Sequence, residues 1–401
     1  MNRIYHSQVS TVIDGLYSIF KDGYYADKVI QRLLKSNPKQ GAKDRAFIAN
    51  SLYEIVRWWR LIWFLTGDQT ELNNNSLYKL FGTYWVWKGN ILPDWIEFSD
   101  INANEIKNRL KEAEQDFGVL QSIPEWMNML GCEELGTEKW QVEIKAMNRE
   151  ADIFIRINTL RTTKEQMIAL LDETKIPHEV IKDDTIQILK RQNLFQLPVF
   201  KKGWFEMQDS GSQLIAPFMQ IEPGMRVIDA CAGAGGKTLH LASLMKNKGK
   251  IIAMDIEAHK LVELKRRAKR AGSSIIETRV IENTKTIKRL KGSADRLLLD
   301  VPCSGLGVLK RNPDAKWKLQ ASFIENLKET QAHIINTYSQ MLKPDGLMVY
   351  ATCSLLKSEN EEQVQKFLAE YTDFSLIEEK YAFPSEGNHD GFYMALIKRN
   401  I

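Results

Sequence analysis

The spacing of apolar side chains changes twice along the chain. Up to about residue 150, apolar residues recur with a period near 3.6, which indicates helices with one buried face. Residues 151–203 contain short runs in which apolar and polar residues alternate, the pattern of strands. From residue 204, short apolar runs and helical patterns follow each other in turn, as in a sheet covered by helices on both faces. The pattern therefore predicts an α/β protein with three domains, over residues 1–150, 151–203 and 204–401.

The first of these domains is predicted to be a helical bundle. Apolar positions on the buried faces of two of its helices are Val9, Val12, Leu16, Leu52 and Val56. The turn-forming residues 37–41 should separate these helices, and Asp44 is expected to cap the second one. The Trp-rich run 84–88 is expected in the core, although aromatic side chains also stack on unpaired bases. A bundle packed on itself explains the pattern better than one that contacts RNA.

The middle domain is predicted to be a small α/β unit. Strands are expected at residues 153–158, 179–181 and 185–189. Thr162 or Thr163 can cap the helix that lies between the first two of them. A sheet that presents side chains to RNA and a mere spacer domain both fit this composition.

The third domain is predicted to be a doubly wound sheet of seven strands. The strand-like runs cover residues 224–230, 250–255, 275–281, 296–299, 346–350, 374–377 and 392–398. Helical patterns fill most of the intervals, at residues 258–271, 321–341 and 359–371. No helix separates the last two strands, so one of them is expected to run antiparallel.

Charge is uneven along the chain although the formal net charge is only +4. Residues 237–291 carry 15 Lys and Arg against 5 Asp and Glu, whereas residues 54–150 carry 10 against 16. The basic excess therefore lies within the predicted large sheet and its helices. It suits a polyanionic substrate, although solvated helix faces also carry lysine.

The four cysteines, Cys132, Cys231, Cys303 and Cys353, lie far apart and form no CxxC pair. The six histidines do not cluster at metal-ligand spacing, so neither a zinc site nor a disulfide framework is expected. The first residues do not resemble a signal peptide, and no apolar run is long enough to span a membrane. A cytoplasmic protein with reduced thiols is the expectation.

A glycine-rich loop, Cys231 to Thr238, stands between a predicted strand and a helix. Its glycines permit a close backbone approach to a ligand and leave amide donors at the helix start. A P-loop is disfavoured, because Cys231 stands where that motif has glycine. Asp255 ends the next strand about 20 residues on, where a carboxylate can bind a ribose diol. Loop and acid together indicate a cofactor that contains adenosine.

Two thiols and a carboxylate are expected at the carboxyl ends of neighbouring strands. Asp300 and Cys303 follow one strand, and Cys353 follows the next strand of the sequence. Ligands of open α/β sheets bind at these ends, so the three groups suggest covalent chemistry. A lone buried cysteine is more often an inert apolar residue, which is the interpretation for Cys132 and Cys231.

A series of motifs in the last half of the chain resembles the RNA cytosine-C5 methyltransferase family, of the Sun or RsmB type. The motifs are, in order, Met207–Gln213, Asp229–Thr238, Asp300–Gly307, Arg311–Trp317, Ala351–Ser354 and Asp390–Tyr393. Asn158–Arg161 resembles the small domain that precedes the family's catalytic domain. Residues 44–57 more loosely resemble the NusB-like helical RNA-binding domain that some members carry. The resemblance implies a Rossmann-like methyltransferase sheet.

The resemblance also implies a cofactor and the residues that bind it. S-adenosylmethionine would be held by a loop made of Cys231, Ala232, Gly233, Ala234, Gly235, Gly236 and Lys237. Asp255 would bind the ribose, and Lys260 would flank the cofactor. The acid on the adenine side would be Glu282, unless Asn283 aligns there instead. Asp300 would contact both the cofactor side and the base.

The same resemblance implies catalytic roles for the two thiols. Cys353 would be the nucleophile and Cys303 would assist product release, with Asp300 as the third catalytic group. Ala234 stands where many members have proline, which should affect loop rigidity rather than chemistry. Arg311, Asn312 and Asp314 either shape the active-site loop or contact a phosphate.

The implied reaction is methylation of carbon 5 of a cytosine in RNA. A thiolate that adds to carbon 6 makes carbon 5 nucleophilic enough to take a methyl group from a sulfonium. Ribosomal RNA is the expected substrate, with transfer RNA as the alternative. A non-catalytic RNA-binding ribosome-assembly factor is a further alternative, which the intact motifs disfavour. A monomer with no metal and no membrane partner is expected.

Overall fold

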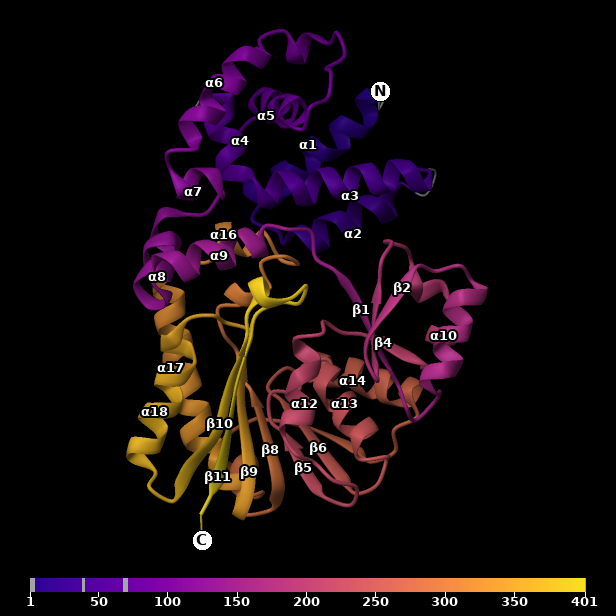
Figure 1. Ribbon diagram of the computed structural model, residues 1–401, viewed down its shortest axis with the longest axis vertical. Coiled ribbons are helices and arrows are strands. Elements are labelled where there is room, and N and C mark those ends of the chain that lie inside the picture. Colours follow the sequence, from indigo (N-terminus) through magenta and orange to yellow (C-terminus); the bar gives the residue numbers. More distant parts are fainter. Residues whose placement is uncertain (1–3, 38–39, 68–70, 401) are drawn as a thin grey trace. The chain divides into compact units, whose positions relative to one another are not determined.

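The computed structural model describes residues 4–37, 40–67 and 71–400, and its internal contacts divide the chain into two compact units. The helical unit comprises Met1–Arg149 together with Leu309–Ala321. The α/β unit comprises Glu150–Val308 and Ser322–Ile401 (Figure 1). The finer division into three domains stays a prediction. In the predicted break at 37–41, residues 38–39 lie outside the described residues.

The helical unit consists of short helices packed around an apolar core. Its N-terminal part contains α1 (His6–Phe20), α2 (Ala26–Ser36), α3 (Ala42–Arg57), α4 (Trp59–Thr66), α5 (Asn74–Trp87), α6 (Ala103–Ala113), α7 (Phe117–Leu120), α8 (Glu125–Leu135) and α9 (Thr137–Met147). The apolar positions predicted on α1 and α3 are all buried in one cluster, which confirms the 3.6-residue period. Tyr84 and Trp85 of the Trp-rich run lie in the same cluster, as expected, whereas Trp87 is half-buried against it and Lys88 is exposed.

The predicted cap of α3 is wrong in one detail. Asp44 lies in the first turn of the helix rather than before it, because α3 begins at Ala42 and Gly41 is the capping residue. The Asp44 carboxylate accepts a hydrogen bond from the Gly41 N–H at 3.1 Å. The carboxylate still satisfies a backbone donor at the helix start, but it reaches back to it from inside the helix.

The segment Leu309–Ala321, called the inserted segment below, leaves the large sheet of the α/β unit and packs within the helical unit. It contains the short helix α16 (Ala315–Lys318). Asp314 is 5% exposed, and its carboxylate accepts a hydrogen bond from the Ala26 N–H at 2.9 Å. Trp317 Nε1 donates to the Val56 carbonyl at 2.7 Å. Of the two roles left open for Asp314, burial excludes contact with a phosphate.

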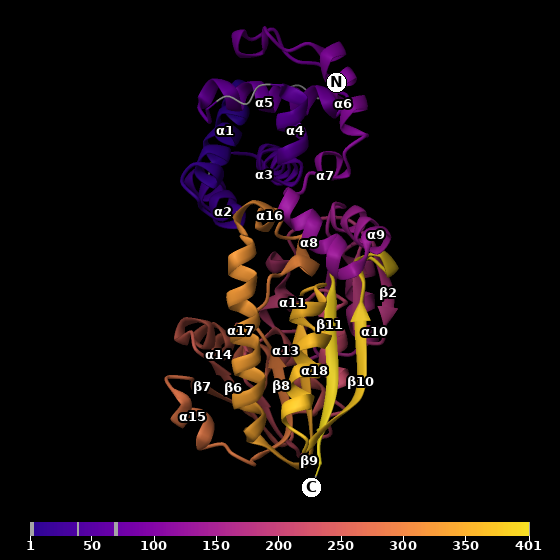
Figure 2. The same cartoon turned by 90° about the vertical axis from the view of Figure 1, so that its left-hand side faces the viewer.

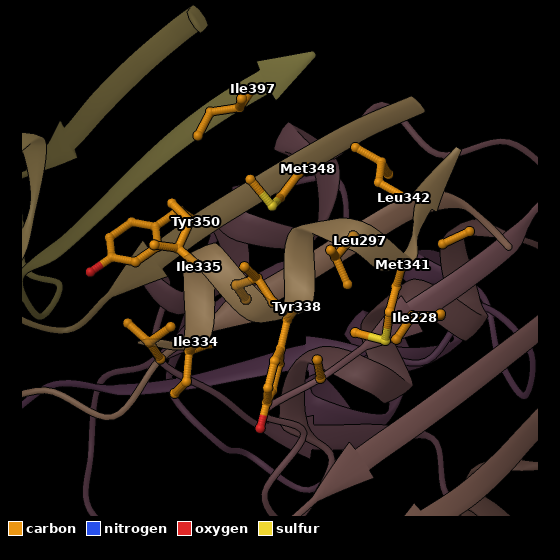
Figure 3. Packing of buried hydrophobic residues seen from close by; sticks show 14 of the residues in the cluster. Ile228, Leu297, Ile334, Ile335, Tyr338, Met341, Leu342, Met348, Tyr350 and Ile397 are labelled. Carbon is orange, nitrogen blue, oxygen red and sulfur yellow. The ribbon is translucent and has the colours of Figure 1, made fainter. Parts of the chain in front are cut away.

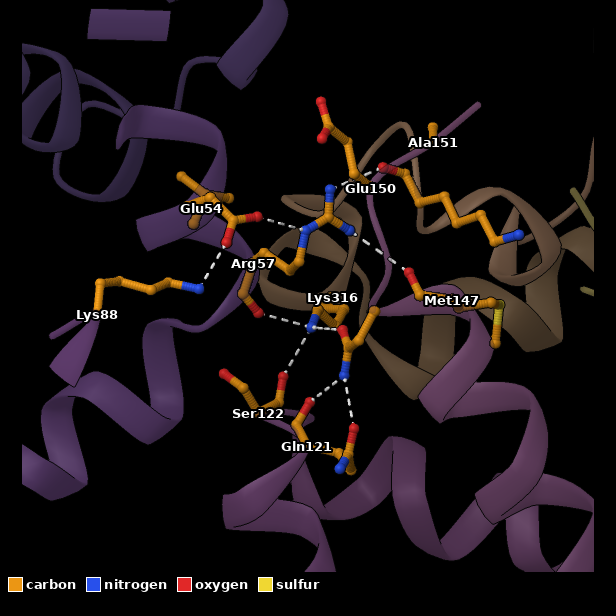
Figure 4. Close-up of polar contacts among 12 residues, drawn as sticks. Glu54, Arg57, Lys88, Gln121, Ser122, Met147, Glu150, Ala151 and Lys316 are labelled. Carbon is orange, nitrogen blue, oxygen red and sulfur yellow. Dashed lines mark hydrogen bonds and ion pairs between the residues drawn. The ribbon is translucent and has the colours of Figure 1, made fainter. Parts of the chain in front are cut away.

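Lys316 is the most deeply buried group of the inserted segment (Figure 4). Its amine donates to the carbonyl of Arg57 at 2.7 Å, the carbonyl of Ser122 at 2.9 Å and Asn148 Oδ1 at 3.0 Å. Burial, and then the nearby Arg57 guanidinium, lower the pKa of Lys316 well below its usual value. Three acceptors around one amine offset the cost of removing it from water.

The α/β unit begins with a four-stranded antiparallel sheet, within the described part of the chain. Its strands, in the spatial order β2-β3-β1-β4, are β1 (Ile153–Ile157), β2 (His178–Lys182), β3 (Thr185–Ile188) and β4 (Phe205–Met207). Helix α10 (Lys164–Glu173) covers it, and Thr163 caps that helix by accepting the Gln166 N–H at 3.3 Å. Strands β1, β2 and β3 confirm the prediction. The three-residue β4 was not predicted, because it is too short to show alternation.

The large sheet that follows has seven strands in the described residues, ordered β10-β11-β9-β8-β5-β6-β7. They are β5 (Arg226–Asp229), β6 (Lys250–Asp255), β7 (Ile276–Val280), β8 (Ala294–Asp300), β9 (Leu342–Thr352), β10 (Phe374–Ala382) and β11 (Phe392–Arg399). β11 is antiparallel to both its neighbours, and the other pairs around β5, β6 and β8 are parallel. All seven predicted strands and the single reversal are confirmed.

Helices cover both faces of the large sheet, because its strands are apolar on both sides (Figure 2). One face packs against α17 (Ala321–Tyr338) and α18 (Glu361–Glu370), with Leu297, Met348 and Tyr350 of the sheet meeting Tyr338 of α17 (Figure 3). The other face packs against α12 (Ile215–Phe218), α13 (Gly236–Leu244) and α14 (Ala258–Ala271). In the described residues, no helix is both long and apolar enough to cross a membrane.

Candidate active site

The carboxyl ends of the parallel strands bring the predicted site residues to one edge of the large sheet. Asp229, Asp255 and Asp300 are the last residues of β5, β6 and β8. β8 lies between β5 and β9, and Asp300 pairs with Ala351 on β9. Cys303 and Cys353 therefore follow the ends of two adjacent strands, at the same edge of the sheet.

The structure brings the two predicted thiols into direct contact. The sulfur atoms of Cys303 and Cys353 are 3.3 Å apart, and the Cys353 N–H lies 3.3 Å from the Cys303 sulfur as a donor. Both residues are partly exposed, so a ligand at the edge of the sheet can reach them. Cys231 is also a free thiol, and Cys132 belongs to the helical unit.

The environment of the thiol pair keeps the proton on Cys303. The contact with Cys353, then burial, then the negative charge of Glu359 raise the pKa of the Cys303 thiol well above its usual value. The Cys303 thiol can therefore donate a hydrogen bond to the Cys353 sulfur.

A buried carboxylate, Glu359, joins the two cysteine-bearing loops. Its oxygens accept the Ser304 N–H at 2.8 Å, the Ser304 hydroxyl at 2.5 Å and the Ser354 hydroxyl. Gln331 Nε2 of α17 adds a fourth hydrogen bond at 3.0 Å. Ser304 and Ser354 each follow a cysteine, so fixing the two serines fixes the separation of the sulfur atoms.

Sequence reasoning missed Glu359. It lies on a 3₁₀ turn, Lys357–Glu359, beyond the second motif and is fully buried. The available signal was the Cys-Ser pair that occurs in both motifs, since two buried hydroxyls at matching positions need a common acceptor.

Lys237 and Asp300 form the second polar pair of the site. The Lys237 ammonium lies 2.6 Å from the Asp300 carboxylate and 5.6 Å from the ring centre of Phe392. Burial acts to lower the pKa of Lys237, but Asp300 more than offsets it, and the pKa lies above its usual value. Lys237 was predicted only as a loop residue, and its pairing with Asp300 was not foreseen. The pair holds the Asp300 carboxylate at the open edge beside the thiols.

The glycine-rich loop is fixed from below by two charged side chains. The Asp255 carboxylate accepts the Gly233 N–H at 2.8 Å and the Glu257 N–H at 2.9 Å. Arg267 of α14 donates to the Ala234 carbonyl at 2.8 Å. Gly235 has a φ of 88°, and a Cβ there would lie 2.6 Å from Leu264, so both backbone shape and packing require glycine.

The space in front of this loop is open at two of its positions. A Cβ on Gly233 or Gly236 would meet no atom within 4 Å. Gly236 is the first residue of α13, where backbone amides have no partner within the helix. The loop therefore offers amide donors and room for a polar ligand.

The remaining predicted residues lie on the same side of the sheet but make different contacts. Lys260 forms an ion pair with Glu257 at 2.6 Å. Glu282 is exposed, whereas the Asn283 side chain accepts the Lys285 N–H at 2.9 Å and caps α15 (Thr284–Lys288). Since Asn283 already has this structural role, Glu282 is the better candidate for the adenine-side acid.

The other motifs close the site from behind. The Gly307 N–H donates to the Cys353 carbonyl at 2.9 Å, and the Gly391 N–H donates to the Gly307 carbonyl at 2.7 Å. The Asp209 carboxylate accepts the N–H of Asp390 at 3.0 Å. A Cβ on Gly307 would lie 2.3 Å from the Gly391 carbonyl oxygen. The backbone segments at these two positions can therefore approach this closely only because residue 307 is glycine. Among the described residues, no group of His, Cys, Asp and Glu fits a metal ion.

We expect the role of Glu359 to appear in a pair of variants. Glu359→Ala leaves buried donors of both serine loops unsatisfied and should lower the free energy of unfolding by about 2–4 kcal/mol. Glu359→Gln keeps the shape and an acceptor oxygen, and the serine hydroxyls can rotate to accept from its amide, so its loss should stay below about 1.5 kcal/mol. Urea denaturation measures both. Equal stability of the two variants would show that Glu359 does not hold the two serine loops together.

The buried carboxyl of Asp229 gives a dependence of stability on pH. Burial raises its pKa to about 7, although the Thr238 hydroxyl, at 2.7 Å, favours the ionised form. The unfolded chain ionises this carboxyl near its usual value of 3.8, so its contribution to stability falls as pH rises from about 4 to 7. Asp229→Asn removes this cost. Relative to the wild type, the variant should gain about 2–3 kcal/mol between pH 5 and pH 8 in denaturation experiments. A difference that does not change with pH would show that Asp229 stays charged.

Comparison with known proteins identifies the family from the sequence. Residues 216–398 match the family described as 16S rRNA methyltransferase RsmB/F, and residues 123–194 match the RsmF/B-like ferredoxin-like domain. The ribosomal RNA small subunit methyltransferase B of Pseudomonas syringae pv. tomato is 30% identical over 309 residues, which cover 72% of this chain and 68% of that protein. The corresponding Vibrio vulnificus protein is 31% identical, over 68% of this chain and 66% of its own length.

The similarity extends over the full length in other cases. The probable ribosomal RNA small subunit methyltransferase B of Synechocystis is 29% identical over 94% of this chain and 95% of its own. In structure, PH0851 covers 99% of both chains with a TM-score of 0.81 at 23% identity. NSun6 from Pyrococcus horikoshii, solved with SFG, covers 70% of this chain with a TM-score of 0.64 at 21% identity. The structural likeness confirms the Rossmann-like fold, and the sequence matches show that the chain belongs to the RsmB/F family of ribosomal RNA small subunit methyltransferases.

Proposed function

We propose that this protein transfers a methyl group from S-adenosylmethionine to carbon 5 of a cytosine in small-subunit ribosomal RNA. The observation that carries the proposal is the contact of two thiols, Cys303 and Cys353, 3.3 Å apart beside Asp300 at the carboxyl edge of the sheet. Membership of the RsmB/F family supports the RNA substrate. The thiol pair supports a covalent mechanism on a pyrimidine ring.

The residues present fit the proposed cofactor. The loop from Cys231 to Lys237 offers amide donors and open space at Gly233 and Gly236, and Asp255 lies beneath it with lone pairs left for a ribose. Glu282 lies beyond the end of β7 as the adenine-side acid, and Lys260 flanks the loop. When bound, S-adenosylmethionine supplies an electrophilic methyl group on a sulfonium.

The first step is the addition of the Cys353 thiolate to carbon 6 of the cytosine. A new carbon–sulfur bond forms, and electron density moves to carbon 5 and towards ring nitrogen 3. Asp300 forms an ion pair with Lys237 at 2.6 Å. Its carboxylate would stabilise a ring that has taken up a proton from solvent at nitrogen 3, by accepting the N–H. Carbon 5 would then take the methyl group, while the bond from that methyl group to the sulfonium sulfur breaks and leaves a neutral thioether.

The last step requires a base that takes the proton from carbon 5. The hydrogen bond with Cys353 is the largest cause of the raised pKa of Cys303. Once the Cys353 sulfur is bonded to carbon 6, it no longer carries the negative charge that holds the Cys303 proton, so the pKa of Cys303 falls. Cys303 can then lose its proton to solvent and accept the one from carbon 5, while the bond from Cys353 to carbon 6 breaks. The thiol pair thus activates Cys303 only after the adduct has formed.

The first prediction concerns the nucleophile. Cys353→Ala should lower the rate of methyl transfer to small-subunit ribosomal RNA by about a thousand-fold or more, because no other group forms the bond to carbon 6. Incorporation of a labelled methyl group measures the rate, and bisulfite sequencing locates the product.

The control is Cys132→Ala, whose thiol belongs to the helical unit and which should retain wild-type activity. Equal activity of Cys353→Ala and wild type would overturn the assigned nucleophile. Methylation of transfer RNA in preference to ribosomal RNA would overturn the proposed substrate but not the proposed reaction at carbon 5. A wild type that binds RNA and methylates none would favour an assembly factor.

The second prediction concerns product release. Cys303→Ala keeps the nucleophile but removes the base, so the enzyme should remain bonded to its RNA after methyl transfer. A denaturing gel should show a slower band of protein joined to RNA, which requires both RNA and S-adenosylmethionine. The double variant Cys303→Ala/Cys353→Ala should abolish that band. Free turnover by Cys303→Ala would contradict the role of Cys303.

A further inference from the structure

A basic hollow lies on the α/β unit, away from the thiols. It has a volume of about 640 Å³ and is lined by Arg161, Lys201, Lys202, Trp204, Arg266, Lys269 and Arg270. Six of these seven side chains are cationic and the seventh is aromatic. They come from the turn after β1, the end of the short helix α11 (Pro198–Lys201) with the turn that follows it before β4, and the second half of α14.

The hollow has a rigid floor. Asn158, which is 3% exposed, donates from Nδ2 to the Gly203 carbonyl at 2.7 Å and the Ala271 carbonyl at 2.8 Å, and so joins all three segments. A Cβ on Gly203 would lie 2.1 Å from the Arg270 carbonyl oxygen. Arg161 lies directly over Gly272, where a Cβ would be 2.3 Å from its Nε. In the motif from Asn158 to Arg161, the first residue is buried and joins the three segments, and the last residue places a cation in the hollow.

The charges of the hollow are only partly neutralised from within the protein. Arg270 pairs with Glu206 at 2.5 Å and lies over the Phe200 ring at 4.1 Å, and Arg266 pairs with Glu263 at 2.8 Å. Among the described residues, no acidic partner is found for Arg161, Lys201, Lys202 or Lys269. Like charges held together on a rigid floor repel one another, and a bound polyanion removes that repulsion.

The hollow also lies at a defined distance from the chemistry. Helix α14 starts at Ala258, just after Asp255 at the catalytic edge, and Arg266, Lys269 and Arg270 lie 8 to 12 residues further on. At a rise of about 1.5 Å per residue, they are roughly 12–18 Å along the helix from that edge. A nucleotide whose base reaches Cys353 does not also fill this hollow, so the ligand is another part of the same polyanion.

We propose that the basic hollow binds the phosphate backbone of the RNA substrate, at nucleotides outside the target cytosine. The inference rests on the proposed function and extends it to a second contact. The cations neutralise phosphates without reading sequence, and the partly exposed Trp204 lines the hollow beside them. The contact orients the RNA and adds affinity, whereas the bond to carbon 6 is made elsewhere.

The test compares two triple variants of the full-length protein that remove the same charge. Lys201→Ala/Lys202→Ala/Lys269→Ala empties the hollow of three unpaired cations. Lys288→Ala/Arg289→Ala/Lys291→Ala removes three exposed cations at and just after the end of α15, none of which lines the hollow. Binding of a labelled small-subunit ribosomal RNA transcript is measured at several salt concentrations, and methyl transfer at several RNA concentrations. Thermal unfolding checks that both variants are folded.

The hollow variant should bind the transcript about 10- to 100-fold more weakly at 150 mM salt, and its slope of log affinity against log salt should fall by about 2–3. Its KM for RNA should rise, whereas its kcat should stay within about twofold of the wild-type value. The α15 variant should stay within about twofold of wild type in both KM and kcat. An unchanged salt slope, or an equal loss in both variants, would overturn the proposal. So would lost binding to anionic phospholipid vesicles with unchanged RNA affinity. If the wild type transfers no methyl group, the proposed function is refuted. The binding data test the basic hollow independently of that result.

Discussion

The buried carboxylate of Glu359 is the constraint on which the candidate active site depends. It accepts hydrogen bonds from the loop after β8, the loop after β9 and helix α17, three parts of the chain that are distant in sequence. Neither loop is regular structure, so parallel pairing of β8 with β9 alone does not set the sulfur separation. A single acceptor with several donors around it does so, since each donor would be left unsatisfied in water-free surroundings if the loops moved apart. The negative charge of the same group also raises the pKa of Cys303.

The topology of the large sheet supplies the rest of the geometry. Because β8 lies between β5 and β9, the glycine-rich loop, Asp300 and the thiols occur side by side along one edge. The strands behind them are apolar on both faces and covered by helices, so the edge is a rigid platform. Lys237 connects the two halves of that platform, since it begins in the glycine loop and ends on Asp300. The glycine-rich loop and the thiols are therefore linked along this edge by one ion pair.

Much of this arrangement follows from patterns in the sequence, and some of it does not. Strands such as β5, β6 and β9 are continuous apolar runs that end in turns or acids, which makes their place and direction predictable. Cys303 and Cys353 stand in motifs directly after such runs, and the structure places them in contact. Glu359 and Lys316 escaped prediction because a buried charge looks like a surface charge until its partners are known. Those partners, Ser304 or Arg57 for example, lie far away along the chain.

The inserted segment means that the helical unit is not a separable N-terminal module. The chain passes between the two units at residues 149–150, 308–309 and 321–322, so each unit is discontinuous or interrupted in sequence. A fragment that begins at residue 150 would carry Lys316 and Trp317 without the carbonyls of Arg57 and Val56 that accept their hydrogen bonds. Recombination could not replace the first 149 residues alone, because the segment that follows the Cys303 loop would have to change with them. Inheritance of the helical unit and of the Cys303 loop is thus coupled through a short stretch of chain, and the two are expected to evolve together.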